Sequence, residues 1–280
     1  MIDGYRVFDA HVHIQPWHHL KAAVRAVMEQ GRDDLADLER YQQNIGALEK
    51  HLQHDGIDGA LLINYVSPDV MGFPRETNDW ALAYTRAATM PVLPMGSVHP
   101  DTVDDVGSEA KRLVEAGVRA FKMHPNHQRL HPADERLWPL YEVASRHGVP
   151  VTIHTGTSVF PGAKNRDADP LGVDDVAVDF PDLRILLAHA GRPFWYDEAF
   201  FVARRHPHVY LELSGIPPAK LLDVLPRIDV VGEKLVWGTD WPSPGVRSMR
   251  GNVEAFLRLQ LDDEVKRRTL WDNAAQLFGM

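Results

Sequence analysis

The chain has 280 residues, of which 44% are hydrophobic and 25% charged, so it can bury at least one sizeable core. Its formal net charge is −9 and its basic residues form no cluster, which argues against a surface for nucleic acids or anionic membranes. It contains no cysteine, so disulfides and thiolate metal sites are excluded, whereas 15 histidines can supply nitrogen ligands.

No apolar run approaches the roughly 20 residues that a membrane-spanning helix needs. The first residues, Met-Ile-Asp-Gly, carry neither the basic nor the apolar region of a secretion signal. We therefore expect a cytoplasmic protein that binds a small-molecule substrate and contacts neither nucleic acid nor membrane.

The first predicted element is a strand over residues 6–13, and its end carries His11 and His13. Side chains alternate between the two faces of a strand, so these two imidazoles point the same way, with Cα atoms about 6.6 Å apart. Both can therefore reach one metal ion. Taken alone, however, a His-x-His pair is more often an ordinary polar end of a strand than a metal site.

Further along the chain, short β-branched or aliphatic runs alternate with amphipathic stretches. The runs cover residues 59–64, 92–98, 118–124, 151–154, 184–189, 209–213 and 235–239. Two of the amphipathic stretches, 101–117 and 139–148, have apolar residues three and four apart and a glycine at the end, which is typical of helices. Strict alternation of this kind predicts parallel βα units.

Eight predicted strands in one chain of this length favour an α/β fold of the (β/α)₈ (TIM) barrel type. A doubly wound open sheet is the alternative, but no G-x-G-x-x-G follows the first strand and no P-loop occurs. No linker marks a boundary, so we expect a single domain over residues 1–280. The segment of residues 17–38 is longer than a typical loop, and we expect it to form a helical insertion over the barrel mouth.

Polar residues end most of the predicted strands, which is where a (β/α)₈ barrel places its active site. Besides the first pair they are His99, Lys122, His124, His154, His189 and Asp240. Each histidine alone is more often a solvated or hydrogen-bonded structural residue than a ligand. Together, at successive strand ends, they indicate a metal site. Tyr65, Glu212 and Ser214 also end strands and face this site if the strand parity is right.

Five segments in this order resemble the amidohydrolase superfamily: DAHVH at 9–13, FKMHP at 121–125, TIHTG at 152–156, LAHAG at 187–191 and WGTDWP at 237–242. More narrowly, the chain resembles the amidohydrolase-related (amidohydrolase 2) group that contains aminocarboxymuconate semialdehyde decarboxylase. The resemblance implies metal ligation by His11, His13, His154 and Asp240. It implies that His189 either binds a second metal or acts in catalysis.

Three imidazoles and one carboxylate suit a divalent ion, and we expect Zn²⁺. Asp240 is then expected to bind the metal and to accept the proton of the attacking water, while His189 polarises a carbonyl or moves a proton. Lys122 has two interpretations: a carboxylated bridge between two metals, or a cation that faces the substrate. We favour one ion over two, because the narrower resemblance is to mononuclear decarboxylases.

For substrate binding, His124, Asn165, Arg166 and Trp241 are the candidates, and Lys164 and Arg192 are further cations that could hold a carboxylate. The expected function is a metal-dependent hydrolase that acts on a small, carboxylate-bearing organic substrate through a metal-activated water. A nonoxidative decarboxylase (carboxy-lyase) is the alternative, and a barrel without chemistry is a third interpretation, which the complete set of ligand types opposes. The resemblance also makes a homodimer plausible.

Overall fold

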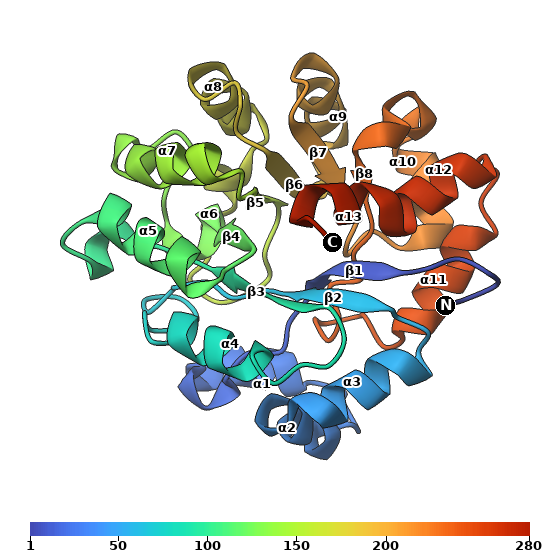
Figure 1. Ribbon diagram of the computed structural model, residues 1–280, viewed down its shortest axis with the longest axis horizontal. Helices are drawn as coiled ribbons and strands as arrows, with labels where there is room; N and C mark the ends of the chain where they lie inside the picture. Colours follow the sequence, from blue (N-terminus) through green and yellow to red (C-terminus); the bar gives the residue numbers. More distant parts are fainter.

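The computed structural model describes residues 1–280 and contains one eight-stranded parallel sheet in the order β1 to β8. This order confirms the predicted (β/α)₈ barrel (Figure 1). The strands are β1 (Phe8–Val12), β2 (Gly59–Leu62), β3 (Val92–Gly96), β4 (Ala120–Met123), β5 (Val151–Gly156), β6 (Ile185–Arg192), β7 (Val209–Glu212) and β8 (Leu235–Val236). Nearly all of their residues are buried, as expected for parallel strands covered by helices.

Hydrogen bonds between the first and last strand regions bring the two ends of the sheet together. The backbone N–H of Ala10 donates to the Trp237 carbonyl at 3.0 Å, and the N–H of Asp240 donates to the His11 carbonyl at 2.9 Å. These two bonds nearly close the barrel. They also place two of the predicted metal ligands, His11 and Asp240, on adjacent backbones.

Thirteen α-helices surround the barrel. They are α1 (Ala22–Glu29), α2 (Leu35–Gln43), α3 (Ile45–His54), α4 (Thr77–Thr85), α5 (Val106–Ala116), α6 (Pro125–Gln128), α7 (Trp138–His147), α8 (Leu171–Asp179), α9 (Tyr196–Arg205), α10 (Leu221–Val224), α11 (Met249–Leu257), α12 (Asp263–Arg267) and α13 (Asn273–Phe278). The 3₁₀ segments are η1 (Trp17–His19), η2 (Pro100–Thr102), η3 (Glu135–Leu137), η4 (Asn165–Ala168), η5 (Pro218–Lys220) and η6 (Ile228–Lys234), and η7 (Arg268–Asp272) is a short π-helix. No helix is long and apolar enough to cross a membrane.

Both predicted amphipathic helices form, with one boundary displaced. α5 begins at Val106 rather than near Asp101, because the Asp105 side chain accepts the N–H of Ser108 and caps the helix there. Gly117, at φ 107°, ends α5 in the left-handed region, where a glycine carries no Cβ penalty. α7 ends in the same way at Gly148, with φ 64°.

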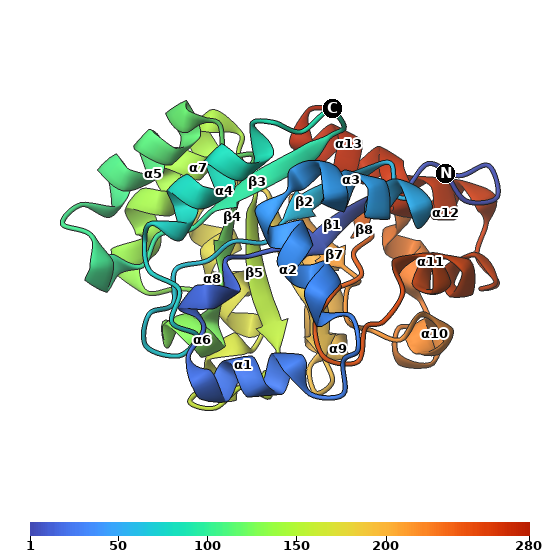
Figure 2. The same cartoon turned by 90° about the horizontal axis from the view of Figure 1, so that it is seen from below.

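Residues 17–38, between the first two strands, form η1, α1 and the beginning of α2. Figure 2 shows α1 beside α6 at the end of the barrel toward which β5 points. From this segment the side chains of Trp17, Leu20 and Met28 line a cavity at the barrel mouth. The segment therefore supplies one wall of the candidate site.

Candidate functional site

His11 lies at the centre of the site and is completely buried on β1. Its Nδ1 is 2.7 Å from Oε2 of Glu212, at the end of β7. Since the carboxylate accepts this hydrogen, the lone pair lies on Nε2, which is buried without a hydrogen-bond partner in the protein. A histidine held by a carboxylate in this way, with its other nitrogen free, is typical of a metal ligand.

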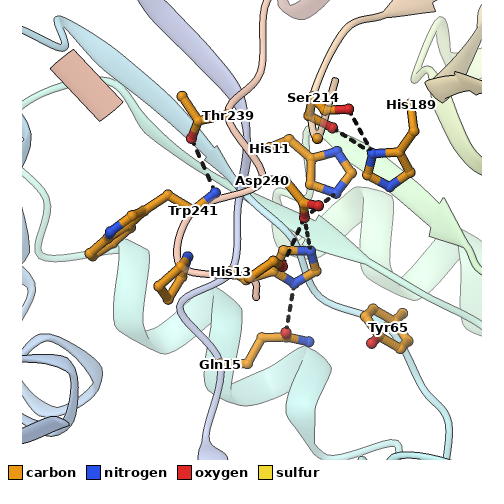
Figure 3. A network of polar contacts seen from close by, with 12 residues as sticks. His11, His13, Gln15, Tyr65, His189, Ser214, Thr239, Asp240 and Trp241 are labelled. Carbon is orange, nitrogen blue, oxygen red and sulfur yellow. Dashed lines mark hydrogen bonds and ion pairs between the residues drawn. The ribbon is translucent and has the colours of Figure 1, made fainter. Parts of the chain in front are cut away.

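Two further imidazoles, those of His13 and His189, also have an oxygen atom beside their Nδ1 (Figure 3). The Nδ1 of His13 is 3.0 Å from Oε1 of Gln15, and the Nδ1 of His189 is 3.0 Å from the Ser214 carbonyl oxygen. Amide and carbonyl oxygens only accept hydrogen bonds, so each Nδ1 carries the hydrogen. The Nε2 of His189 therefore has a lone pair available for a cation, whereas the Nε2 of His13 faces Oδ1 of Asp240 at 3.1 Å.

Asp240 follows β8 and is surrounded by these rings. Its Oδ1 is 3.1 Å from His13 Nε2 and 3.8 Å from His11 Nε2. Burial alone would raise the pKa of Asp240, but the contact with His13 and the nearby positive groups hold it below its usual range. The carboxylate is therefore ionised at neutral pH, and one ligand atom each from His11, His189 and Asp240 lie within 4.8 Å of one another.

His154, on β5, lies beside this group rather than within it. Its ring centroid is 4.6 Å from that of His189 and 3.9 Å from that of His124, on which it stacks with an interplanar angle of 14°. Its Nε2 is also buried without a hydrogen-bond partner. Burial lowers the pKa of each of these three imidazoles well below its usual value, so all three are neutral, which metal ligation requires.

Two cations face the same space. Lys122, on β4, is 1% exposed and its Nζ has no hydrogen-bond partner in the protein. Burial lowers its pKa to about 8, although the charges of Glu212 and Asp240 act in the opposite direction. Arg192, at the end of β6, donates to the Gly215 carbonyl at 2.8 Å, and its Nη1 lies 3.7 Å from Asp240 Oδ2.

These polar groups line one side of a cavity with a volume of about 470 Å³. The lining also has an apolar part, called the apolar wall here, which is formed by Trp17, Leu20, Met28, Met71 and Phe73. The first three belong to η1, α1 and the residues between them, and the last two to the loop that follows β2.

The two segments of the apolar wall are joined through their backbones. The N–H of Lys21 donates to the Met71 carbonyl at 2.9 Å, and this bond joins the two segments. Within the loop that follows β2, the N–H of Ser67 donates to the Phe73 carbonyl at 2.9 Å. The wall is therefore built into the fold rather than carried on a free loop.

Three of the four predicted substrate-binding residues lie outside the cavity lining. The Arg166 side chain is 80% exposed and lies 3.4 Å from the carboxylate of Asp167. The Trp241 ring is buried 4.8 Å from the His51 ring and therefore packs against α3. Of the four, His124 alone lines the cavity.

Asn165 is the third residue outside the cavity lining, and it supports the loop that follows β5. Its Oδ1 accepts the backbone N–H of Ser158 at 2.8 Å and the Nδ2–H of Asn126 at 3.0 Å. It therefore acts on the loop conformation rather than on a ligand directly.

Sequence reasoning did not single out three residues of the site: Gln15, His127 and Ser158. His127 is completely buried in the cavity lining, stacked on His124 at 3.6 Å. Its spacing of three residues from His124, just after a strand end and a proline, is the signal that could have identified it.

The fold and the site together define a (β/α)₈ barrel whose strand ends bring together histidine and carboxylate groups that could hold a metal ion. The chain belongs to the amidohydrolase family, because the family model described as amidohydrolase matches residues 8–280.

Two characterised relatives match part of the chain. It is 33% identical over 90 residues to 4-sulfomuconolactone hydrolase from Hydrogenophaga intermedia. This match covers 27% of this chain and 30% of that relative. It is 34% identical over 95 residues to L-fucono-1,5-lactonase from Burkholderia ambifaria. This match covers 28% of this chain and 33% of that relative. The matches thus span about a third of each relative's length.

Solved structures resemble the whole chain in fold. An uncharacterised TIM-barrel protein from Bordetella bronchiseptica has a TM-score of 0.78, 21% identity and 98% coverage of both chains. The 5-carboxyvanillate decarboxylase from Sphingomonas paucimobilis has a TM-score of 0.74 at 18% identity, covering 99% of this chain and 100% of that chain. The same enzyme from Novosphingobium aromaticivorans, complexed with manganese, has a TM-score of 0.71 at 14% identity, covering 99% and 97%.

Proposed function

We propose that this protein is a metal-dependent hydrolase that opens the lactone ring of a small, carboxylate-bearing organic acid through an activated water. One observation carries the proposal: His11, His13 and His189 each have their Nδ1 hydrogen held by an oxygen, with their rings around one ionised carboxylate, that of Asp240. Both partially matching relatives are named as hydrolases of lactones, which supports this choice of bond.

The metal site consists of His11, His13, His154 and Asp240 in this proposal. Their nitrogen and oxygen donors suit Zn²⁺, and the unpartnered buried Nε2 atoms of His11 and His154 fit a cation. When bound, such an ion acts as a Lewis acid and lowers the pKa of a water to about 7. We favour one ion; a second would require Lys122 to be carboxylated, and a metal-to-protein ratio near two would show it.

The protein's own groups then have separate tasks. Asp240, ionised and beside His13, accepts the proton of the attacking water. His189, neutral and with its Nδ1 hydrogen held by Ser214, accepts a proton at Nε2 and moves it to the leaving oxygen.

The cavity also supplies binding groups for both parts of an acid substrate. Arg192 and Lys122 attract the substrate carboxylate, and His124 lies beside them in the lining. The body of the substrate lies against the apolar wall, where Met71 and Phe73 offer no hydrogen bonds. A ring with few hydroxyl groups fits this wall better than a fully hydroxylated one, because a buried hydroxyl without a partner is costly.

The test is hydrolysis of a panel of five- and six-membered lactone carboxylates by protein loaded with Zn²⁺ or Mn²⁺. We expect ring opening that a chelator abolishes and that Asp240→Asn lowers by at least about 10³-fold, since it removes the proton acceptor. Asp175→Asn, at an exposed aspartate of α8, is the matched control and should leave the rate unchanged. Full turnover by Asp240→Asn would contradict the proposal.

The same panel should include aromatic acids, with carbon dioxide release as the readout. A decarboxylase is the alternative function, since the amidohydrolase barrel also occurs in the decarboxylases named above. Metal-dependent carbon dioxide release without lactone hydrolysis would replace the first proposal by the second.

A further inference from the structure

Three side chains of the cavity lining form a hydrogen-bonded chain that the proposed reaction does not use. The Tyr65 hydroxyl, after β2, lies 3.1 Å from Nδ1 of His127, and Nε2 of His127 lies 2.7 Å from Oγ of Ser158. Tyr65 and His127 are completely buried, while Ser158 lies on the half-exposed loop that follows β5. The chain therefore connects a buried phenol to the mouth of the cavity.

His127 is fixed in its plane, so both of its nitrogens keep their directions. Its ring stacks on His124 with centroids 3.6 Å apart and an interplanar angle of 13°. Its backbone carbonyl also accepts the hydroxyl of Ser67 at 2.9 Å. A rotation of the ring would break the stack and both side-chain hydrogen bonds together.

The chain has two possible polarities, because each member has a fixed number of hydrogens. Burial lowers the pKa of His127 to about 3 and raises that of Tyr65 far above its usual range, so the imidazole and the phenol are both neutral. In one polarity Tyr65 donates to Nδ1 and His127 donates to Ser158. In the other, Ser158 donates to Nε2, His127 donates to Tyr65, and the phenol hydrogen is free to point elsewhere.

The surroundings of both ends favour the second polarity when a substrate is present. Ser158 Oγ already accepts the N–H of Phe160 at 3.3 Å, so its own hydrogen is available for His127. The Tyr65 ring meets the His13 ring edge-on, with centroids 6.4 Å apart (Figure 3), and both residues line the cavity. A phenol hydrogen that is not bonded to His127 can therefore point into the cavity.

We propose that the Tyr65 hydroxyl donates a hydrogen bond to a substrate oxygen, and that His127 and Ser158 are positioning residues that keep its hydrogen free for this contact. The inference rests on the proposed function only in taking an oxygen-rich acid as the ligand. Tyr65 would be a catalytic residue that touches the substrate, whereas the other two act through it.

The test is a double-mutant cycle on the metal-loaded enzyme. We expect Tyr65→Phe to lower kcat by about 10²-fold, as loss of one donor to developing charge does, with KM changed by less than about threefold. Ser158→Ala should lower kcat by about fivefold, because His127 loses the donor that sets its polarity, and Ser158→Thr should restore it. Tyr141→Phe, which removes another buried, hydrogen-bonded hydroxyl outside the cavity, is the control and should leave kcat unchanged.

The decisive comparison is Ser158→Ala in the Tyr65→Phe background. If Ser158 acts only through Tyr65, the double variant equals Tyr65→Phe alone, whereas a further fivefold loss would overturn the proposal. If the wild type hydrolyses no lactone, the same cycle is measured as the Kd of glutarate by calorimetry. There we expect Tyr65→Phe to weaken binding about tenfold, because a glutarate carboxylate already carries the charge that a lactone oxygen develops only in the transition state, and unchanged binding would overturn this inference separately from the proposed function.

Discussion

Single hydrogen atoms decide what the imidazoles of this site can bind. The Nδ1 hydrogen of His11 is held by a carboxylate, that of His13 by an amide and that of His189 by a backbone carbonyl. These partners fix the tautomers of His11 and His189, so their two Nε2 atoms present lone pairs without any rearrangement, while the Nε2 of His13 faces the Asp240 carboxylate. Such preorganisation reduces the free-energy cost of assembling a metal site.

Glu212 provides a direct test of this arrangement. Replacing it by Gln keeps the shape but removes the charge that orients His11, so we expect metal affinity to fall about 10- to 100-fold. Competition with a chelator of known affinity measures this change. Glu142→Gln, at an exposed position on α7, should leave the affinity unchanged. Equal affinity in both variants would show that Glu212 is not an orienting group.

Trp241 illustrates a second role at the residue scale, since it packs between the barrel and the helices outside it. Its ring lies 4.8 Å from His51 and 6.0 Å from Tyr41. We expect Trp241→Ala to lower the free energy of unfolding by about 3 to 5 kcal/mol, as loss of a buried aromatic ring does. Denaturant titration measures this value. Trp138→Ala, at a partly exposed tryptophan on α7, should cost clearly less.

Outside the site, an ion pair between a buried carboxylate and a partly exposed arginine joins two elements. Glu109, on α5, is 5% exposed and accepts hydrogen bonds from Arg75, which precedes α4, and from Arg112. Burial alone would raise the pKa of Glu109, but the two guanidinium groups bring it below its usual value. The carboxylate therefore stabilises the fold above the unfolded pKa of about 4.3, and this contribution is lost as pH falls through the folded pKa.

Glu109→Gln should accordingly lower the free energy of unfolding at pH 7 by about 1 kcal/mol, a modest value because both arginines are partly exposed. The difference between variant and wild type should shrink as pH falls below about 4. Denaturant titrations at several pH values give this dependence. A difference that grew in acid would contradict the assignment.

The elements also show how far the sequence predicts the structure. Alternation of buried strands with amphipathic stretches was sufficient for the barrel, because parallel strands with both faces covered need only continuous apolar runs. The start of α5 was misplaced, since both Asp101 and Asp105 are suitable caps and only packing selects between them. The strand-end residues, including Lys122 and His124, were found because strand direction alone brings them to one rim.

Loop residues could not be predicted in the same way. Arg166 and Asn165 follow the same strand as His154, but the loop conformation directs one to solvent and the other to the backbone of Ser158. Trp241 directly follows Asp240, whose positive φ of 69° redirects the chain, so the two side chains diverge. Dihedral angles of this kind depend on tertiary packing rather than on neighbouring residues.

The whole molecule should respond to metal as one unit, because the proposed ligands come from β1, β5 and the end of β8. An ion that binds only the folded state stabilises it by about 4 kcal/mol when its concentration is 1,000 times its Kd. We therefore expect chelation to lower Tm by roughly 10 °C. Calorimetry before and after re-addition of Zn²⁺ or Mn²⁺ measures this shift. An unchanged Tm would argue against a site shared by these strands.

The backbone at two functional positions has a consequence for engineering. His189 and Asp240 adopt φ angles of 66° and 69°, in the left-handed region that costs most residues about 1 kcal/mol or more and that glycine adopts without a Cβ penalty. A library screened only for resistance to heat, without metal or substrate, would therefore enrich glycine at these two sites. Thermal selection and catalytic selection would then favour different residues at the positions where the barrel carries its proposed chemistry.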